Sequence, residues 1–387
     1  MDAGESQSTR FISAESLATF GLTFLAFPLA WLLRHGLGMD EAEYLVGATM
    51  FYLAHVINDP HFSVTYVLFY RRVRERLWGD AWDRSQRVRY ALAGFVAPAV
   101  LVCWAIIAIA THSAQTLGFM VQLMFLLVGW HYAKQGFGML TVLSGRRGVR
   151  FTHHERRVIL GHCYAAWAFA WANPAQVAGN FVEKGVVYWA PAHPRWLEII
   201  AGAILTTSAL LLAHTLYAKW RREGHLPLVA VIGFLTTIWL WTIYTRLDPL
   251  VQYVIPALHS VQYLYFVWLM TKNETAAAEG PPTFGPPVRT RIVTLSLTAL
   301  LLGWFLFRGA PQFFDALWTS GSHGSNVRNT LGDTPFFAAF FVVVNIHHYF
   351  MDSVLWRREN PQTSYLYATP QREPIEATHA GQLVAFD

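Results

Sequence analysis

The chain has 387 residues, of which 54% are hydrophobic and only 14% are charged. Soluble domains carry roughly 25% charged residues, so this composition argues against a soluble protein and for one that contacts the lipid bilayer. The net charge of +5 comes from arginine-rich stretches that flank apolar runs, and it gives no support to nucleic-acid binding.

Apolar runs of about 20 residues, the length that crosses a hydrocarbon core, recur along the chain. They predict an all-α fold, a polytopic transmembrane helical bundle of about ten spans. We expect the second span to be broken at Asp59 and Pro60, because proline removes a backbone donor and disfavours helix at the residue before it. The predicted spans are 15–33, 44–70, 90–110, 116–143, 157–172, 196–218, 227–245, 249–271, 292–308 and 335–356.

Basic residues are concentrated in alternate loops between these spans. This alternation predicts that both termini are cytoplasmic, because short cytoplasmic loops carry an excess of arginine and lysine. We expect an integral protein of a bacterial inner (cytoplasmic) membrane. The basic stretches are 71–89, 144–157, 219–226 and the segment that begins at Arg357.

The chain divides into four predicted parts. Proline and glycine mark a flexible cytoplasmic linker, and a polar tail is expected to be loosely ordered. The parts are 1–271 with eight spans and most of a histidine site, the linker 272–291, 292–358 with the last two spans and His347 and His348, and the tail 359–387.

Histidines interrupt four of the predicted spans at a similar depth. Counted from the basic edge at 1.5 Å per residue, they lie roughly 13–22 Å into the membrane, near its middle. Ionisable groups at this depth are costly and usually face the bundle interior, where they have partners. Neutral imidazoles can offset that cost by binding a metal ion. The candidate metal ligands are His61, His131, His259, His347 and His348.

A polar residue follows several histidines at the i,i+4 spacing, which places both side chains on one helix face. Metal-bound histidines commonly use such neighbours to fix the ring orientation. Tyr263 is predicted to be catalytic, as a ligand or proton donor, and the others to orient the ligands. The pairs are His55 with Asp59, His131 with Gln135, His259 with Tyr263, and His348 with Asp352.

The residue types alone leave the chemistry open. A histidine cluster without thiolates suits iron, zinc or copper, and the absence of an HEXXH motif argues against a zinc protease helix. Haem bound by two facing histidines would indicate an electron-transfer or quinone-binding protein. A third alternative is a non-catalytic transporter or membrane subunit with a buried polar network, since membrane histidines often serve only as interhelical hydrogen-bond partners.

Four short stretches around these histidines follow one another in a characteristic order. They are "DPHF" with His61, "GWHYAKQG" with His131, "LHSVQYLYFVW" with His259, and "IHHYFMD" with His347 and Asp352. In these stretches the chain resembles the Brp/Blh family of bacterial membrane β-carotene dioxygenases. That family has a second histidine where Tyr263 stands here, and a proline where Ile346 stands here.

The resemblance implies a non-haem iron site that is reached from the lipid. In this interpretation His348 is an alternative ligand for the one that is missing at Tyr263. We therefore predict an enzyme, a membrane-embedded non-haem iron oxygenase. Its expected substrate is a lipophilic small molecule, such as a polyene, a sterol or an acyl chain.

Overall fold

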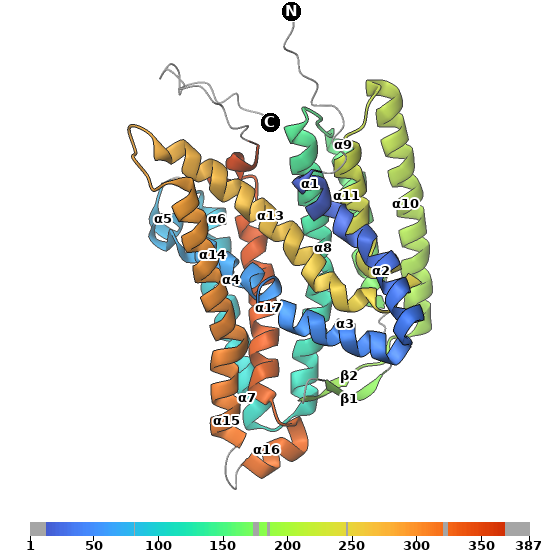
Figure 1. The fold of residues 1–387 in the computed structure, drawn as a ribbon, viewed down its shortest axis with the longest axis vertical. Helices are drawn as coiled ribbons and strands as arrows, with labels where there is room; N and C mark the ends of the chain where they lie inside the picture. The colour runs from blue at the N-terminus through green and yellow to red at the C-terminus, as the bar shows by residue number, and fades with distance from the viewer. Residues whose placement is uncertain are drawn as a thin grey trace, which may run out of the picture.

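A computed structural model describes residues 13–80, 82–172, 178–183, 186–244, 247–319 and 324–367. Long helices make up most of these residues, and the predicted all-α helical bundle is confirmed (Figure 1). Both ends of the described chain lie at the same end of the bundle. Arg146 shows this directly, because its side chain lies 4.0 Å from Glu15 Oε2 and donates to the carbonyl of Leu366 at 3.1 Å.

The first part of the bundle contains the broken second span and the longest helix. Its elements in order are α1 (Ala14–Ser16), η1 (Leu17–Gly21), α2 (Leu22–Leu37), α3 (Met39–Leu53), α4 (Asn58–Tyr70), α5 (Val73–Trp78), α6 (Arg84–Ala91), η2 (Leu92–Val96), α7 (Ala97–Ala110), α8 (Ala114–Arg146) and α9 (His153–Ala172).

A hairpin separates this part from the remaining helices. The further elements are β1 (Gly179–Glu183), β2 (Val186–Ala190), α10 (Arg195–Glu223), α11 (Leu228–Trp239), η3 (Leu240–Tyr244), α13 (Val251–Glu279), α14 (Val288–Trp304), η4 (Phe305–Gly309), α15 (Ala310–Thr319), α16 (Gly324–Leu331), α17 (Pro335–Leu355) and η5 (Pro361–Leu366).

Within the described residues, seven helices are long and apolar enough to cross a membrane, as expected of an integral membrane protein. The other three predicted spans are also helical, but they are too short or too polar to meet this description. The count of ten crossings and the cytoplasmic placement of the termini stay predictions. The seven helices are Ala14–Leu37, Arg84–Ala110, Ala114–Arg146, Arg195–Glu223, Val251–Glu279, Val288–Trp318 and Pro335–Leu355.

The second span is broken at residues 54–57, shortly before the predicted break at Asp59 and Pro60. Helix α3 ends at Leu53, residues 54–57 form turns, and α4 begins at Asn58. Pro60 therefore lies in the first turn of α4, where a backbone N–H has no partner within the helix and its loss costs little. Helix α3 lies across the direction of the long helices, so the break turns the chain into the bundle (Figure 1).

Two short π-helical segments, η1 and η2, each have a backbone carbonyl that accepts a hydrogen bond from a side chain of a neighbouring helix. Such i→i+5 turns interrupt the regular hydrogen-bond ladder of an α-helix. In η1, the carbonyl of Thr19 accepts from Gln262 Nε2 of α13 at 2.7 Å. In η2, the carbonyl of Gly94 accepts from the hydroxyl of Tyr70 in α4. These bonds tie η1 to α13 and η2 to α4, and both of these helices carry candidate site residues.

The loop predicted at 173–195 contains an antiparallel hairpin of β1 and β2, in which Gly179 pairs with Ala190 and Glu183 with Val186. The hairpin packs directly on α8. A Cβ added at Gly118 would lie 2.2 Å from the carbonyl oxygen of Trp189, so only glycine permits this approach. Strands of only five residues carry little sequence signal beside long apolar spans.

Two segments expected to be flexible are partly ordered. Helix α13 continues to Glu279, well into the predicted linker 272–291, and α14 begins at Val288. The predicted tail 359–387 is described as far as residue 367, where η5 packs on α13, and its remainder lies outside the described residues. We name residues 356–367 the closing segment.

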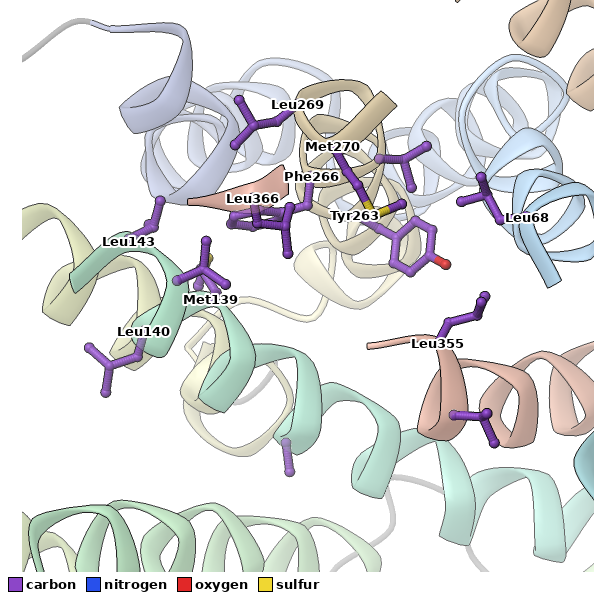
Figure 2. Close-up of a cluster of buried hydrophobic side chains, with 14 of the residues drawn as sticks. Leu68, Met139, Leu140, Leu143, Tyr263, Phe266, Leu269, Met270, Leu355 and Leu366 are labelled. Atoms are coloured by element: carbon purple, nitrogen blue, oxygen red, sulfur yellow. The ribbon is translucent and has the colours of Figure 1, made fainter. Parts of the chain in front are cut away.

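The closing segment completes a hydrophobic core at one end of the bundle. Figure 2 shows Leu366 among leucine, methionine and phenylalanine side chains of α8 and α13. The amide of Asn273 also donates to the carbonyl of Tyr365 at 2.8 Å. Tyr263 lies at the edge of this core, and its hydroxyl points away from Met139 and Leu140 (Figure 2). Apolar packing thus ends where the polar groups of the site begin.

Candidate metal centre

Four buried histidines from four different helices meet inside the bundle. Helix α17 packs against α4 and α8, and α13 packs against α4. The Nε2 atoms of His131 and His259 lie 2.9 Å apart. The ring of His61 lies 4.5 Å from that of His348 and 5.1 Å from that of His259, measured between centroids. None of the four is more than 4% exposed. We call these residues the histidine cluster.

The cluster offers nitrogen atoms at spacings close to those of a metal site. One ring nitrogen from each of His61, His131 and His348 lies within 4.8 Å of the other two. Two nitrogens at about 2.1 Å from the same ion can be at most about 4.2 Å apart. Three nitrogens around one tetrahedral ion lie only about 3.4 Å apart, so the widest spacing would have to shorten by roughly 0.6–1.4 Å for all three to bind one ion.

Ser260 fixes which nitrogen of His61 is available. Its hydroxyl donates towards Asn58 Oδ1 at 2.9 Å or the carbonyl of Pro256 at 2.7 Å. The serine oxygen then accepts from His61 Nδ1 at 3.1 Å. This leaves a lone pair on His61 Nε2, which is buried and has no hydrogen-bond partner among the described residues.

Asp352 lies beside two members of the cluster, one helical turn after His348. Its Oδ2 atom lies 3.3 Å from His348 Nε2 and 3.7 Å from His131 Nδ1. His348 Nδ1 is buried without a hydrogen-bond partner in the described part of the chain. A carboxylate in this place can orient both rings, which is the role that metal-bound histidines commonly require of a neighbour.

Tyr263 contacts the carboxylate rather than offering its oxygen to the cluster. Its hydroxyl donates to Asp352 Oδ1 at 2.8 Å and accepts from Trp356 Nε1 at 3.1 Å. Thr65 Oγ1 lies 2.6 Å from the same hydroxyl. The tyrosine ring lies edge-on to His61 with centroids 4.4 Å apart. With three polar neighbours, this hydroxyl positions Asp352, and the geometry does not favour the ligand role predicted from the sequence.

His347 faces away from the histidine cluster, although the sequence made it a candidate ligand. Its Nδ1 lies 3.0 Å from the hydroxyl of Tyr66, and its Nε2 lies 3.4 Å from that of Tyr70. Successive residues of an α-helix point about 100° apart. Only one of two adjacent histidines can therefore face the cluster, and it is His348.

The remaining predicted residues lie around the site rather than on the cluster rings. Gln135 Nε2 donates to the carbonyl of His259 and to Gln262 Oε1, both at 3.2 Å, so it contacts the backbone of a cluster residue. His55 and Asp59 form a separate pair at the start of α4, with Nδ1 and Oδ2 3.3 Å apart.

Several residues that complete the site were missed from the sequence. Ser260 contacts His61 and is itself bound to Asn58, while Thr65 and Trp356 contact Tyr263. One signal was available, because Trp356 follows Asp352 at the i,i+4 spacing that was used for the other pairs. The contacts between α4 and α13 have no such local signal.

Aromatic rings enclose the cluster. Tyr132 lies over His259 with ring centroids 4.1 Å apart, and Tyr349 stacks on His131 at 4.8 Å. Phe62 lies 4.8 Å from His348. Apolar walls of this kind exclude water and raise the cost of any buried nitrogen that lacks a partner.

No protein-family model, no curated protein and no solved structure matches this chain.

Proposed function

We propose that this chain is an integral membrane metalloenzyme, a non-haem iron oxygenase that acts on a lipophilic substrate. The observation that carries the proposal is the histidine cluster, in which four imidazoles from four helices meet in a water-poor interior. A polyene, a sterol or an acyl chain would reach such a site from the lipid.

The buried nitrogens support a bound cation. Leaving a buried donor or acceptor unpaired costs about 1–3 kcal/mol. His61 Nε2 and His348 Nδ1 are both without a hydrogen-bond partner in the residues described. Because their other nitrogens lie beside Ser260 and Asp352, the orientation of each ring is already fixed. A metal ion bound at these nitrogens would offset the cost.

The donor set narrows the choice of metal. Imidazole nitrogens without thiolates suit iron, zinc and copper. The close contact of His131 with His259 favours a bare ion over haem, because two axial histidines must stand on opposite sides of a porphyrin. The resemblance of four motifs to the Brp/Blh family favours iron among the three. His61, His131, His259 and His348 would hold it.

The protein residues around the cluster would hold the ligands and control protons. Bound iron would supply the activation of O₂, which needs an open coordination position. Asp352 would orient His131 and His348, and it would accept a hydrogen bond from the hydroxyl of Tyr263. Ser260 would keep the proton of His61 on Nδ1. The aromatic walls would exclude water and contact the apolar substrate.

The orientation of the chain follows from its charges. We place the end of the bundle that carries Arg146 and the closing segment on the cytoplasmic side of a bacterial inner membrane. Glu274 lies at this end and is bound by Arg71 at 2.9 Å. The bilayer is then the source of the substrate, and the cluster lies within its hydrocarbon region.

Elemental analysis of detergent-purified protein tests the proposal. We expect about one iron per chain, without the Soret band of a haem. Uptake of O₂ after addition of a polyene, sterol or fatty-acyl substrate would then identify the reaction. Zinc in place of iron would indicate a hydrolase. A folded protein without metal would overturn the proposal in favour of a transporter or membrane subunit.

A further inference from the structure

A second polar group lies beside the histidine cluster, at the break between α3 and α4. It consists of His55, Asp59 and Arg308: His55 Nδ1 lies 3.3 Å from Asp59 Oδ2, and Arg308 lies over the ring of Phe51, four positions before His55. Asp59 is buried, whereas the side chain of His55 is 34% exposed. We call these three residues the polar triad.

Arg308 occupies an unusual position for a cation. It lies in η4, inside one of the helices that are long and apolar enough to cross a membrane. Its guanidinium carbon lies 4.0 Å from the ring centroid of Phe51, while its Nη2 is a long 3.4 Å from the carbonyl of that residue. Its Nε atom is buried and has no hydrogen-bond partner in the described ranges. An arginine inside a membrane-spanning helix costs free energy and usually has a functional role.

The triad borders exposed apolar residues, and its Asp59 lies on the same helix as His61 of the cluster. Beside it, the apolar residues Tyr52 and Val56 are 69% and 57% exposed. Asp59 lies two positions before His61 on α4, so the triad and the cluster share one turn of this helix. On the other side, α14 packs tightly against α4, because a Cβ at Gly303 would lie 2.9 Å from the carbonyl carbon of Asp59. One molecule could therefore touch both groups from the bilayer.

The chemistry of the triad indicates what it would bind. Arg308 and His55 are hydrogen-bond donors, and a carboxylate can accept several hydrogen bonds at once. The charges of Arg308 and Asp59 largely cancel, so the triad does not select an anion. A neutral group that both donates and accepts fits this arrangement, and a hydroxyl is the smallest such group.

We propose that the polar triad binds the hydroxyl group of a lipophilic alcohol whose apolar body extends to the histidine cluster. This inference rests on the proposed function for the role of the cluster and deepens it, because it restricts the substrate to lipids with a hydroxyl end. Binding of the alcohol itself does not require a metal and can be measured separately.

Competition binding on the purified full-length chain tests the triad. The probes are oleyl alcohol and cholesterol, each tritiated, and each is displaced by its own unlabelled alcohol or by the corresponding methyl ether. The ether keeps the apolar body but cannot donate to Asp59. We expect at least one alcohol to bind about tenfold more tightly than its ether. Equal affinity within both pairs, or no saturable binding, would overturn the proposal, as would a stronger preference for oleate over oleyl alcohol.

Substitutions test whether the preference for the alcohol over its methyl ether comes from the triad. Arg308→Gln should abolish the discrimination between alcohol and ether, whereas Arg34→Gln should retain it. Arg34 is a matched control because it lies at the end of α2 and pairs with Asp248 at 3.5 Å. His55→Phe keeps a ring of similar size and should reduce the discrimination even if Arg308→Gln fails to fold. Full discrimination in a folded His55→Phe protein would overturn the proposal.

Metal content measured on the same samples separates the two proposals. Alcohol discrimination in a protein without metal would retain the triad and refute the oxygenase. Metal without discrimination would refute the triad alone.

Discussion

The histidine cluster and His162 are equally buried, yet their surroundings differ in kind. His162 is fully buried between α9, α10 and α11. Its Nδ1 lies 2.9 Å from Ser208 Oγ, and its Nε2 accepts from Trp239 Nε1 at 3.2 Å. Both nitrogens are therefore satisfied by the protein. In the cluster, by contrast, His61 Nε2, His259 Nδ1 and both nitrogens of His348 are buried without a hydrogen-bond partner among the described residues.

This comparison shows that burial does not by itself mark a functional histidine. A buried imidazole with two partners contributes to helix packing. A group of buried imidazoles that lie together and keep several nitrogens without a partner is the arrangement that a bound ion would satisfy. The following predictions test this distinction, from the largest expected effect to the smallest.

His131→Ala should remove the metal, because it deletes a donor at the centre of the cluster. We expect the metal content per chain to fall by about tenfold or more, since removal of one partner leaves the remaining donors unable to hold the ion. His162→Ala should retain full metal content. Inductively coupled plasma mass spectrometry on both purified variants measures this. Equal metal contents in the two variants would remove the distinction between the sites.

Asp352→Asn should weaken the metal affinity without abolishing it. The amide keeps the shape of the side chain but loses the negative charge beside His131 and His348, and loss of such a partner typically costs 10–100-fold in affinity. Competition against a chelator gives the affinity. Asp315→Asn is the control, because Asp315 accepts from the backbone N–H groups of Phe336 and Phe337 at the start of the same helix. An unchanged affinity in Asp352→Asn would contradict the orienting role.

Ser260→Ala should have a smaller effect on the metal, about tenfold in affinity, at the lower limit for a residue that orients a ligand. The alanine leaves His61 Nδ1 without its acceptor, so the ring can adopt the other tautomer. Ser208→Ala is the matched variant, because it removes the equivalent hydroxyl from His162. The same chelator titration should show no change for Ser208→Ala. Equal metal affinities of the two serine variants would show that Ser260 does not control the tautomer of His61.

His162→Ala should affect stability instead. It leaves the hydroxyl of Ser208 and the indole N–H of Trp239 without their partner, at a cost of about 1 kcal/mol or more in the free energy of unfolding. A thermal melt in detergent, compared with that of the wild-type protein, measures the loss. A variant with an unchanged melting temperature would mean that these contacts contribute nothing.

The sequence predicts how far along its helix each histidine lies, but it does not predict which way the side chain points. Counting from the arginine-rich edges groups His61, His131 and His259 at one level, because the rise per residue of a helix is fixed. The structure places these three together. The count cannot choose between His347 and His348, whose side chains point about 100° apart, because the rotation of α17 depends on its neighbours.

Contacts between helices were the part that could not be predicted. Ser260 is next to His259 in sequence, but its partner His61 lies on α4, and nothing local connects the two. The position of the helix break was also missed, since Pro60 is tolerated in the first turn of a helix as well as after one ends. The local spacing rule found Asp352 because both members of that pair lie on a single helix.

The order of the cluster residues along the chain has a consequence for biosynthesis. His61 belongs to an early helix and His348 to a late one, so the first donor enters the membrane long before the last. At roughly 5–20 residues per second of translation, the delay is on the order of tens of seconds. Throughout this interval α4, α8 and α13 expose imidazoles without their final partner. A chain that ends before α17 would therefore keep these three imidazoles without the contacts that His348 and Asp352 provide.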